Sequence, residues 1–371
     1  MKKVQKKFHA DKNLRSMIFD LHQYTAGKSI EEIAHKYKIN PSRIIKLGSN
    51  ENVLGSSIKA KAAATSALEK VNIYPDVVSE QLSKKIKKHY GLKNNIEVVV
   101  GNGMDHVFEM LARLFLNNGD ETVISVPTFS CYELTTLWSG AKPKMIPLTK
   151  DYQLNVPKIL SLINKKTKII FICSPNNPTG NLIKTEDIKK ILDSTDKIVF
   201  LDEAYTEFAG KSLVNWIEKY PNLIIGRTFS KIYGLAGFRV GYAFIHKTLA
   251  QYYLNAITPF AVSRPGQAAA LAALDDSAFV NKTIKMVKEG RDFYYKELTK
   301  SGIKFLPSDA NFITINTALK KSKDIALRLL EKGIIVRECS TFGYGGDKLL
   351  RITIGTREQN QRVLNALREI I

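Results

Sequence analysis

Lys231 is placed where a lysine amine could do chemistry. It lies in a glycine-rich loop directly after the apolar run Leu223–Arg227, and hydroxyl groups flank it at Thr228 and Ser230. A lysine held in a pocket can have its amine pKa lowered and can attack a carbonyl to form a Schiff base. Arg239 follows eight positions later and could bind a phosphate. In a chain with 56 basic residues a single lysine is usually a surface residue, so the interpretation depends on its neighbours.

Two other apolar runs end in polar groups that could face the same ligand. Asp202 follows the run Lys197–Leu201, where a carboxylate must be paired, solvated or functional, unless it only caps a helix. Asn177 lies in the turn Ser174–Gly180, in which two prolines and a glycine exclude a helix. The amide of Asn177 can therefore bind a ligand in this turn.

Two further loops add a phosphate-binding element and an aromatic ring. The glycine turn Gly101–Asp105 precedes a helical pattern and would present free backbone N–H groups to a phosphate. His106 stands where a dinucleotide-binding turn has its third glycine, so that motif is absent. Phe129 follows the run Thr122–Val126, where a ring can stack on a planar ligand or pack in the core. An amine, a carboxylate, a phosphate-binding set and a stacking ring together match the needs of pyridoxal 5′-phosphate.

The order and content of these segments resemble a fold-type I aminotransferase of the class I/II superfamily. The segments that carry this resemblance are NNPTG (176–180), DEAY (202–205) and TFSKIYGLAGFRVGY (228–242). Four others resemble the histidinol-phosphate aminotransferases: SNEN (49–52), YPD (74–76), VRE (336–338) and RITIGT (351–356). This resemblance extends from about residue 21 to the C-terminus. It implies a reversible, ping-pong transfer of an amino group from L-histidinol phosphate to 2-oxoglutarate, giving imidazole-acetol phosphate and L-glutamate in histidine biosynthesis.

The resemblance also implies which residues hold the cofactor, pyridoxal 5′-phosphate. Lys231 would bind it covalently and later move a proton, Asp202 would pair with the protonated pyridine nitrogen, and Phe129 would stack on the ring. Tyr205 and Asn177 would contact the phenolic oxygen. The groups expected around the cofactor phosphate are the backbone of Met104 and Asp105, the side chains of Thr228, Ser230 and Arg239, and Tyr74 of a second subunit. A homodimer is therefore part of the expectation.

For the substrate, the resemblance implies two arginines. Arg351 would bind the α-carboxylate, with Asn177 beside it, and Arg337 together with Tyr24 would bind the substrate phosphate. A surface salt bridge is the alternative interpretation of Arg337. The chain departs from the usual family pattern at three positions, Val53, His106 and Glu338. These departures leave an aromatic amino acid aminotransferase or a threonine-phosphate decarboxylase of the same superfamily as alternatives.

The elements that must position these residues follow a regular pattern. Short apolar runs alternate with helical stretches between about residues 57 and 201, which predicts βαβ units and a mostly parallel sheet. The expected strands are Ile96–Val100, Thr122–Val126, Ala141–Ile146, Lys168–Cys173, Lys197–Leu201, Leu223–Arg227 and Val240–Ile245. In such α/β sheets ligands bind beyond the carboxyl ends of the strands, where the polar groups above stand.

With the resemblance, we expect the α/β architecture of PLP-dependent transferases of fold type I. The large domain, with its sheet flanked by helices, would comprise residues 57–276. A smaller α/β domain would be built from both ends of the chain, 28–56 and 277–371. Residues 1–27 would form an N-terminal arm. The length of 371 residues is consistent with two domains.

Composition bounds the location and the partners. The net charge of +21 comes from dispersed lysine clusters, which favours a solvated surface over a nucleic-acid footprint. The segment Ile30–Arg43 resembles the first part of a helix-turn-helix, so a DNA-binding protein is the alternative from another class. Three distant cysteines, no signal-peptide pattern and no apolar run near 18 residues predict a cytoplasmic protein without membrane contact. We expect small-molecule substrates, no nucleic acid and no metal.

Overall fold

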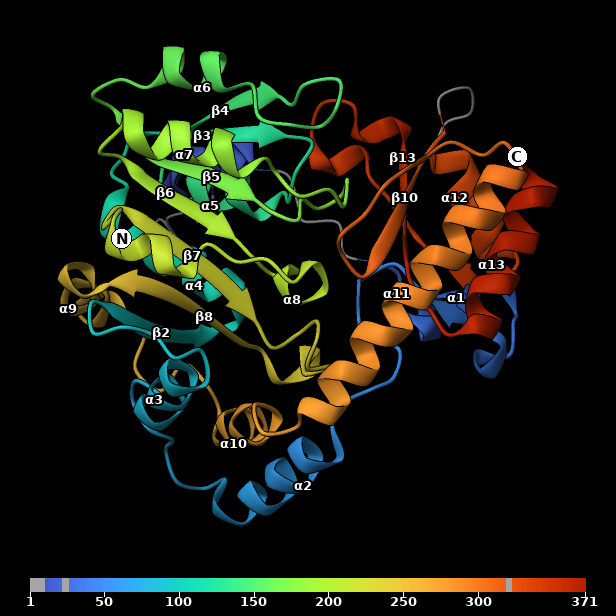
Figure 1. Ribbon diagram of the computed structural model, residues 1–371, viewed down its shortest axis with the longest axis horizontal. Coiled ribbons are helices and arrows are strands. Elements are labelled where there is room, and N and C mark those ends of the chain that lie inside the picture. Colours follow the sequence, from blue (N-terminus) through green and yellow to red (C-terminus); the bar gives the residue numbers. More distant parts are fainter. Residues whose placement is uncertain (1–10, 22–26, 318–321) are drawn as a thin grey trace, which may run out of the picture.

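A seven-stranded sheet forms the centre of the computed structural model, which describes residues 11–21, 27–317 and 322–371 (Figure 1). The strand order is β2-β8-β7-β6-β5-β3-β4. The bounds are β2 Ile96–Asn102, β3 Glu121–Val126, β4 Lys142–Pro147, β5 Thr167–Cys173, β6 Ile198–Asp202, β7 Leu223–Thr228 and β8 Val240–His246. β8 pairs antiparallel with both neighbours and the other pairings are parallel, so the predicted sheet is confirmed.

Helices cover both faces of this sheet, which explains why its strands are almost continuously apolar. One face packs against α4 (Gly103–Phe115), α5 (Cys131–Trp138) and α9 (Lys247–Ala256). The other face carries α3 (Glu80–His89), α6 (Val156–Leu162), α7 (Thr185–Ser194) and α10 (Arg264–Ala273). α2 (Ile58–Ala67) packs on α10, and the short α8 (Thr206–Ala209) follows β6.

A second, smaller sheet lies beside the first (Figure 1). Its order is β12-β13-β10-β9, all antiparallel. The strands are β9 Phe305–Leu306, β10 Phe312–Asn316, β12 Arg337–Glu338 and β13 Leu349–Thr353. The helices of this part are α11 (Ser277–Lys300), α12 (Ser322–Glu331) and α13 (Arg357–Ile370).

The beginning of the chain joins this second part. β1 (Ile45–Lys46) pairs in parallel with β11 (Ile334–Ile335), and Thr353 N donates a hydrogen bond to Leu47 O at 2.8 Å. The sequence pattern alone did not place this segment, because its strand has two residues. The domain boundaries 1–27, 28–56, 57–276 and 277–371 stay a prediction.

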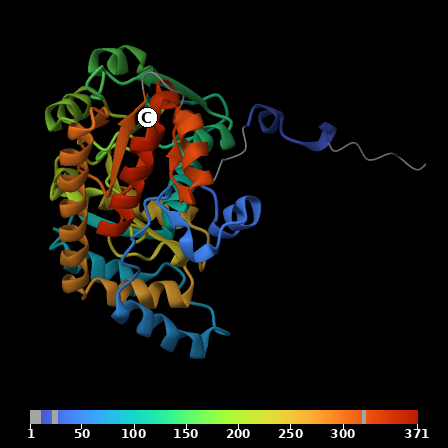
Figure 2. The same ribbon diagram turned by 90° about the vertical axis from the view of Figure 1, so that its right-hand side faces the viewer.

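The N-terminal region contradicts the DNA-binding alternative. α1 (Ile30–Tyr37) is followed by the 3₁₀ turn Pro41–Arg43 and then by β1, so in this described stretch no second helix is available to enter a DNA groove. Ahead of it, two 3₁₀ turns, Asp11–Asn13 and Ser16–Asp20, project from the side of the molecule (Figure 2). In the described ranges, no helix combines the length and the apolar character needed to cross a membrane.

Candidate active site

A pocket lies at the carboxyl ends of the parallel strands, at the N-terminus of α4 and against β12 and β13 of the second sheet. Thr128 N, after β3, donates a hydrogen bond to Phe342 O at 2.9 Å, so the second part contacts the strand-end loops directly. The pocket brings together twelve residues predicted from the sequence: Met104, Asp105, Phe129, Asn177, Asp202, Tyr205, Thr228, Ser230, Lys231, Arg239, Arg337 and Arg351. Seven different loops and strands therefore converge as the sequence predicts.

Lys231 is held beyond the end of β7 with its amine in the pocket. Its Nζ donates a hydrogen bond to the carbonyl oxygen of Ser49 at 3.1 Å and lies 6.0 Å from the centre of the Tyr205 ring. Burial, with the Arg351 guanidinium nearby, lowers the pKa of the Lys231 amine to about 8. About a tenth of this amine is thus neutral and nucleophilic at pH 7, far more than for a surface lysine with its ordinary pKa.

Asp202 ends β6, and its carboxylate is 4% exposed. Tyr132 Oη donates a hydrogen bond to one carboxylate oxygen at 2.6 Å, and the Ala204 backbone N–H donates to the other at 2.9 Å. Burial raises the pKa of the Asp202 carboxyl to about 6, although both hydrogen bonds act in the opposite direction. Because burial removes the water that would stabilise this carboxylate, a positively charged group of a ligand would stabilise it instead.

The first turn of α4 and the residue Arg239 form an anion-binding corner. The free N–H groups of a helix N-terminus point towards an anion placed there. Arg239 forms an exposed ion pair with Asp105 at 2.8 Å at the same corner. Two glycines permit the arrangement: a Cβ on Gly103, whose φ is +77°, would lie 2.5 Å from the Arg239 guanidinium, and a Cβ on Gly241 would lie 2.6 Å from Met104 N.

Arg337 and Arg351 lie directly opposite each other on the paired strands β12 and β13. They are 8% and 5% exposed, and both guanidinium groups contact the Phe342 ring. Arg351 donates hydrogen bonds to Asn177 Oδ1 and to Gly48 O, the latter at 2.6 Å. Among the described residues, the Arg337 side chain donates a hydrogen bond only to Thr341 Oγ1, at 3.3 Å. Like charges opposite each other are unfavourable, so this pair indicates a pocket that takes anionic groups.

Two predicted site residues stand apart from the pocket. Tyr74 is 76% exposed on the loop after α2, where its ring stacks on Phe260 at 4.7 Å. That position leaves its predicted role in a second subunit as a prediction. Tyr24 lies outside the described residues.

The model of the family described as aminotransferase class I and II matches residues 42–367. The chain belongs to this family. The matched region includes both sheets and every pocket residue named above. The candidate site of this aminotransferase therefore lies within the part of the chain that the family shares.

Three of the individual proteins that resemble this aminotransferase are described as histidinol-phosphate aminotransferases. The histidinol-phosphate aminotransferase of Methanosarcina mazei is 46% identical over 353 residues, 95% of each chain. That of Methanocaldococcus jannaschii is 39% identical, covering 97% of this chain and 98% of its own. A solved histidinol-phosphate aminotransferase from Sinorhizobium meliloti, in complex with pyridoxal-5′-phosphate, superposes with a TM-score of 0.86. It is 24% identical and covers 96% of this chain and 97% of that one, which shows the shared fold.

Sequence reasoning missed two polar residues of the aminotransferase site. Tyr132, the donor to Asp202, stands three positions after Phe129 on α5, and the two rings lie 5.8 Å apart. Helical i, i+3 spacing from a predicted site residue was the signal that could have found it. Asn50 donates a hydrogen bond from Nδ2 to Tyr205 Oη at 2.9 Å; it was recognised as part of a family motif but was given no role.

Proposed function

We propose that the chain transfers the amino group of L-histidinol phosphate to 2-oxoglutarate with pyridoxal 5′-phosphate as cofactor. The observation that carries this proposal is the buried pair Arg337 and Arg351 in the pocket that also holds Lys231. Two cationic groups side by side match the anionic groups of the two substrates, the phosphate of L-histidinol phosphate and the α-carboxylate of 2-oxoglutarate. The relatives named as histidinol-phosphate aminotransferases, at up to 46% identity over nearly the whole chain, support the same substrate.

The donor set of the pocket fits this cofactor. A buried carboxylate with a raised pKa, Asp202, suits a protonated ring nitrogen, because an opposite charge repays its desolvation. The amine of Lys231, with its lowered pKa, suits covalent attachment to an aldehyde. The α4 N-terminus with Arg239, Thr228 and Ser230 suits the phosphate. Phe129 and Tyr205 border the space between these ends.

When bound, pyridoxal 5′-phosphate supplies an electron sink that stabilises negative charge at the substrate Cα. The chain supplies orientation, charge and proton transfer. Asp202 keeps the ring nitrogen protonated, and Tyr132 orients the Asp202 carboxylate. Lys231 would be placed to take the proton from the substrate Cα and to deliver it to C4′ of the cofactor, since its pKa of about 8 allows both protonation states.

The two arginines divide the recognition of the substrates. Arg351 binds the α-carboxylate of glutamate and 2-oxoglutarate through its planar guanidinium, which Asn177 and Gly48 O hold in place. Arg337 binds the phosphate of L-histidinol phosphate. Alternating occupation of one pocket by the two substrates corresponds to a ping-pong reaction.

Two further parts of the proposal concern assembly and location. We propose a homodimer in which Tyr74 reaches the phosphate group of the cofactor held by the other subunit, supported by the exposure of Tyr74 and Phe260 beside it. We propose a cytoplasmic location, supported by the free thiols of Cys131, Cys173 and Cys339.

A substrate panel tests the proposal. The protein is purified with pyridoxal 5′-phosphate, and kcat/KM is measured for L-histidinol phosphate, phenylalanine and threonine phosphate with 2-oxoglutarate as acceptor. We expect L-histidinol phosphate to give the highest kcat/KM. A higher value for phenylalanine, or carbon dioxide release from threonine phosphate, would assign one of the two alternatives instead.

A further inference from the structure

A buried ion pair lies behind the pocket, on the opposite face of the two strands that carry Asp202 and Thr228. Glu203 follows Asp202 at the end of β6, and Arg227 precedes Thr228 in β7. The two charged residues are 2% and 3% exposed. Arg227 donates to Glu203 Oε2 from both Nε, at 3.1 Å, and the terminal nitrogen NH2, at 2.8 Å.

Side-chain alternation puts this ion pair and the pocket on different faces. A Cβ on Gly226 would contact Met104 and Phe200, so Gly226 and, two positions on, Thr228 face α4 and the pocket. Arg227 therefore points the other way, where its guanidinium lies 4.7 Å from the centre of the Tyr90 ring. In the part of the chain that the structure describes, no side chain proposed to bind substrate or cofactor hydrogen-bonds to the side chains of the pair.

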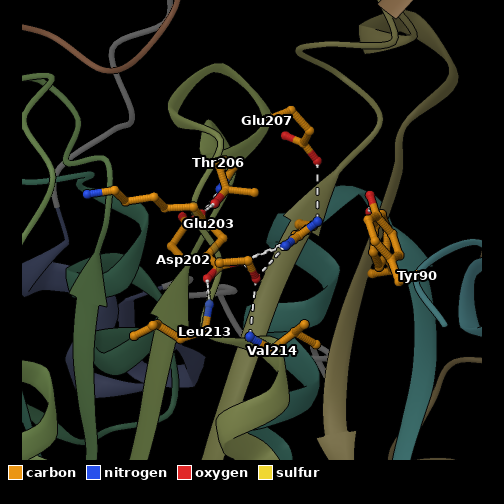
Figure 3. A network of polar contacts seen from close by, with 12 residues as sticks. Tyr90, Asp202, Glu203, Thr206, Glu207, Leu213 and Val214 are labelled. Atoms are coloured by element: carbon orange, nitrogen blue, oxygen red, sulfur yellow. Dashed lines mark hydrogen bonds and ion pairs between the residues drawn. The ribbon is translucent and has the colours of Figure 1, made fainter. Parts of the chain in front are cut away.

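Neighbouring residues form further hydrogen bonds with both members of the ion pair. The Leu213 backbone N–H donates to Glu203 Oε1 at 2.8 Å, and Ser212 Oγ donates to Oε2 at 2.8 Å (Figure 3). Ser212 in turn accepts from Arg227 at 2.6 Å. Buried ion pairs add little stability compared with apolar residues of the same volume, because both ions lose their hydration. Stability alone is therefore a weak reason for a pair at this place.

The position of the pair along the strands suggests another reason. The register between β6 and β7 ends where Asp202 is opposite Gly226, and Glu203 N donates to Gly226 O at 2.9 Å. Glu203 and Arg227 are the next residues of the two strands, and their side chains join the strands beyond this point. The pair thereby ties together the two strand ends that present Asp202 and Thr228 to the pocket.

We propose that Glu203 and Arg227 are positioning residues that set the separation between Asp202 and Thr228. This inference rests on the proposed function, in which Asp202 binds the ring nitrogen of the cofactor and Thr228 its phosphate. The ring nitrogen and the phosphate belong to one molecule, in which a planar ring and a short arm limit the distance between them, so the two strand ends must be held at a distance within that limit. A small error in that distance weakens binding and misplaces the ring.

Glu207 provides a matched control within the same network. Its Oε1 lies 3.7 Å from Arg227 and, among the described residues, accepts no hydrogen bond (Figure 3). Glu207 belongs to α8 rather than to a strand end. Burial raises the pKa of its carboxyl to about 7, so a glutamine resembles the protonated form that is already present near neutral pH. Glu207→Gln therefore removes an ionisable carboxyl from the network and leaves the hydrogen bonds between Glu203 and Arg227 in place.

The test compares Glu203→Gln, Arg227→Lys and Glu207→Gln in the cofactor-loaded protein. Two quantities are measured besides activity: the dissociation constant of pyridoxal 5′-phosphate and the pH midpoint of the visible absorbance band. We expect Glu203→Gln and Arg227→Lys to weaken cofactor binding by about tenfold or more and to shift the midpoint. Glu207→Gln should bind within about twofold of wild type. Wild-type values for both quantities in Glu203→Gln would overturn the inference.

A double variant separates positioning from stability. Glu203→Gln combined with Arg227→Met removes both charges, so no ion is left buried without a partner. We expect its thermal midpoint to recover relative to Glu203→Gln while cofactor binding stays weak. Recovery of both together would show a purely structural role and overturn the inference. If the wild-type protein itself forms no visible-absorbing complex with pyridoxal 5′-phosphate, the proposed function is overturned together with this inference. Failure of the inference alone leaves the wild-type complex intact, so the two results can be told apart.

Discussion

At the scale of single residues, the pocket brings together ionisable side chains that are largely removed from water. Arg337 and Arg351 face each other across β12 and β13 although both are buried. Asp202 is buried with a raised pKa, and Lys231 with a lowered one. Each of these groups is unfavourable in isolation and becomes favourable when a ligand of opposite charge or an electrophile arrives. The pattern is that of a binding site for a small, highly charged molecule.

Replacing Arg337 by Met should affect one substrate only. We expect KM for L-histidinol phosphate to rise about 10- to 100-fold, because a charged hydrogen-bond partner of the phosphate is lost. The half-reaction with glutamate should keep its rate, since Arg351 still binds the α-carboxylate. Single-turnover absorbance measurements with each substrate check this. Arg351→Met is the matched variant and should impair glutamate; equal damage by Arg337→Met to both substrates would contradict the division of roles.

The lowered pKa of Lys231 predicts a pH dependence for cofactor attachment. Only the neutral amine attacks an aldehyde, and its fraction falls about tenfold for each pH unit below the pKa. With a pKa of about 8, the attachment rate to cofactor-free protein should rise from pH 6 to 8 and level off above. Stopped-flow absorbance after mixing with pyridoxal 5′-phosphate measures it. A rate that still rises steeply to pH 10 would mean that the lysine has its ordinary pKa.

At the scale of elements, the site depends on how closely α4 approaches β8. Gly241 of β8 lies against the first turn of α4, where a Cβ would come within 2.5 Å of Gly103 C. This close approach brings the N–H groups of α4 beside Arg239. A helix N-terminus binds an anion only if its first turn is correctly placed.

Gly241→Ala should displace the first turn of α4. We expect cofactor affinity to fall about tenfold or more, together with a loss of about 1–3 kcal/mol of stability from overpacking. Equilibrium dialysis and chemical unfolding measure the two effects. Gly237→Ala is the control in the neighbouring turn, because a Cβ there would contact nothing within 4 Å. A Gly241→Ala protein that binds like the control would show that the helix adapts without cost.

Local sequence signals predicted the elements and the polar groups at their ends, but not the long-range contacts. The apolar runs before Asn177, Asp202 and Lys231 predicted the strands and showed that a polar group follows the end of each. The reversed direction of β8 has no local signal, because an apolar run looks the same in either direction. The bond from Tyr132 to Asp202 joins positions 70 residues apart, so no window of sequence contains both.

At the scale of the whole molecule, the site lies where two sheets meet and where residues 48–51 come together with β12 and β13. β1 pairs with β11, and the residues that follow β1 offer the Ser49 carbonyl to Lys231, while β12 and β13 add the arginines. Separate parts of the chain therefore line one pocket. The positive net charge of +21 adds a field that attracts anionic substrates at low salt without selecting among them.

The proposed homodimer predicts that two inactive variants restore each other. In a mixed dimer of Lys231→Ala and Tyr74→Ala, one site has both defects, and the other combines an intact Lys231 with an intact Tyr74. Random pairing on co-expression should therefore recover about a quarter of wild-type activity. Lys231→Ala mixed with Asp202→Ala is the control: Lys231 and Asp202 line one pocket of the same chain, so neither site of that dimer is complete. If Tyr74 served its own subunit, or the protein were monomeric, the first mixture would stay as inactive as the control.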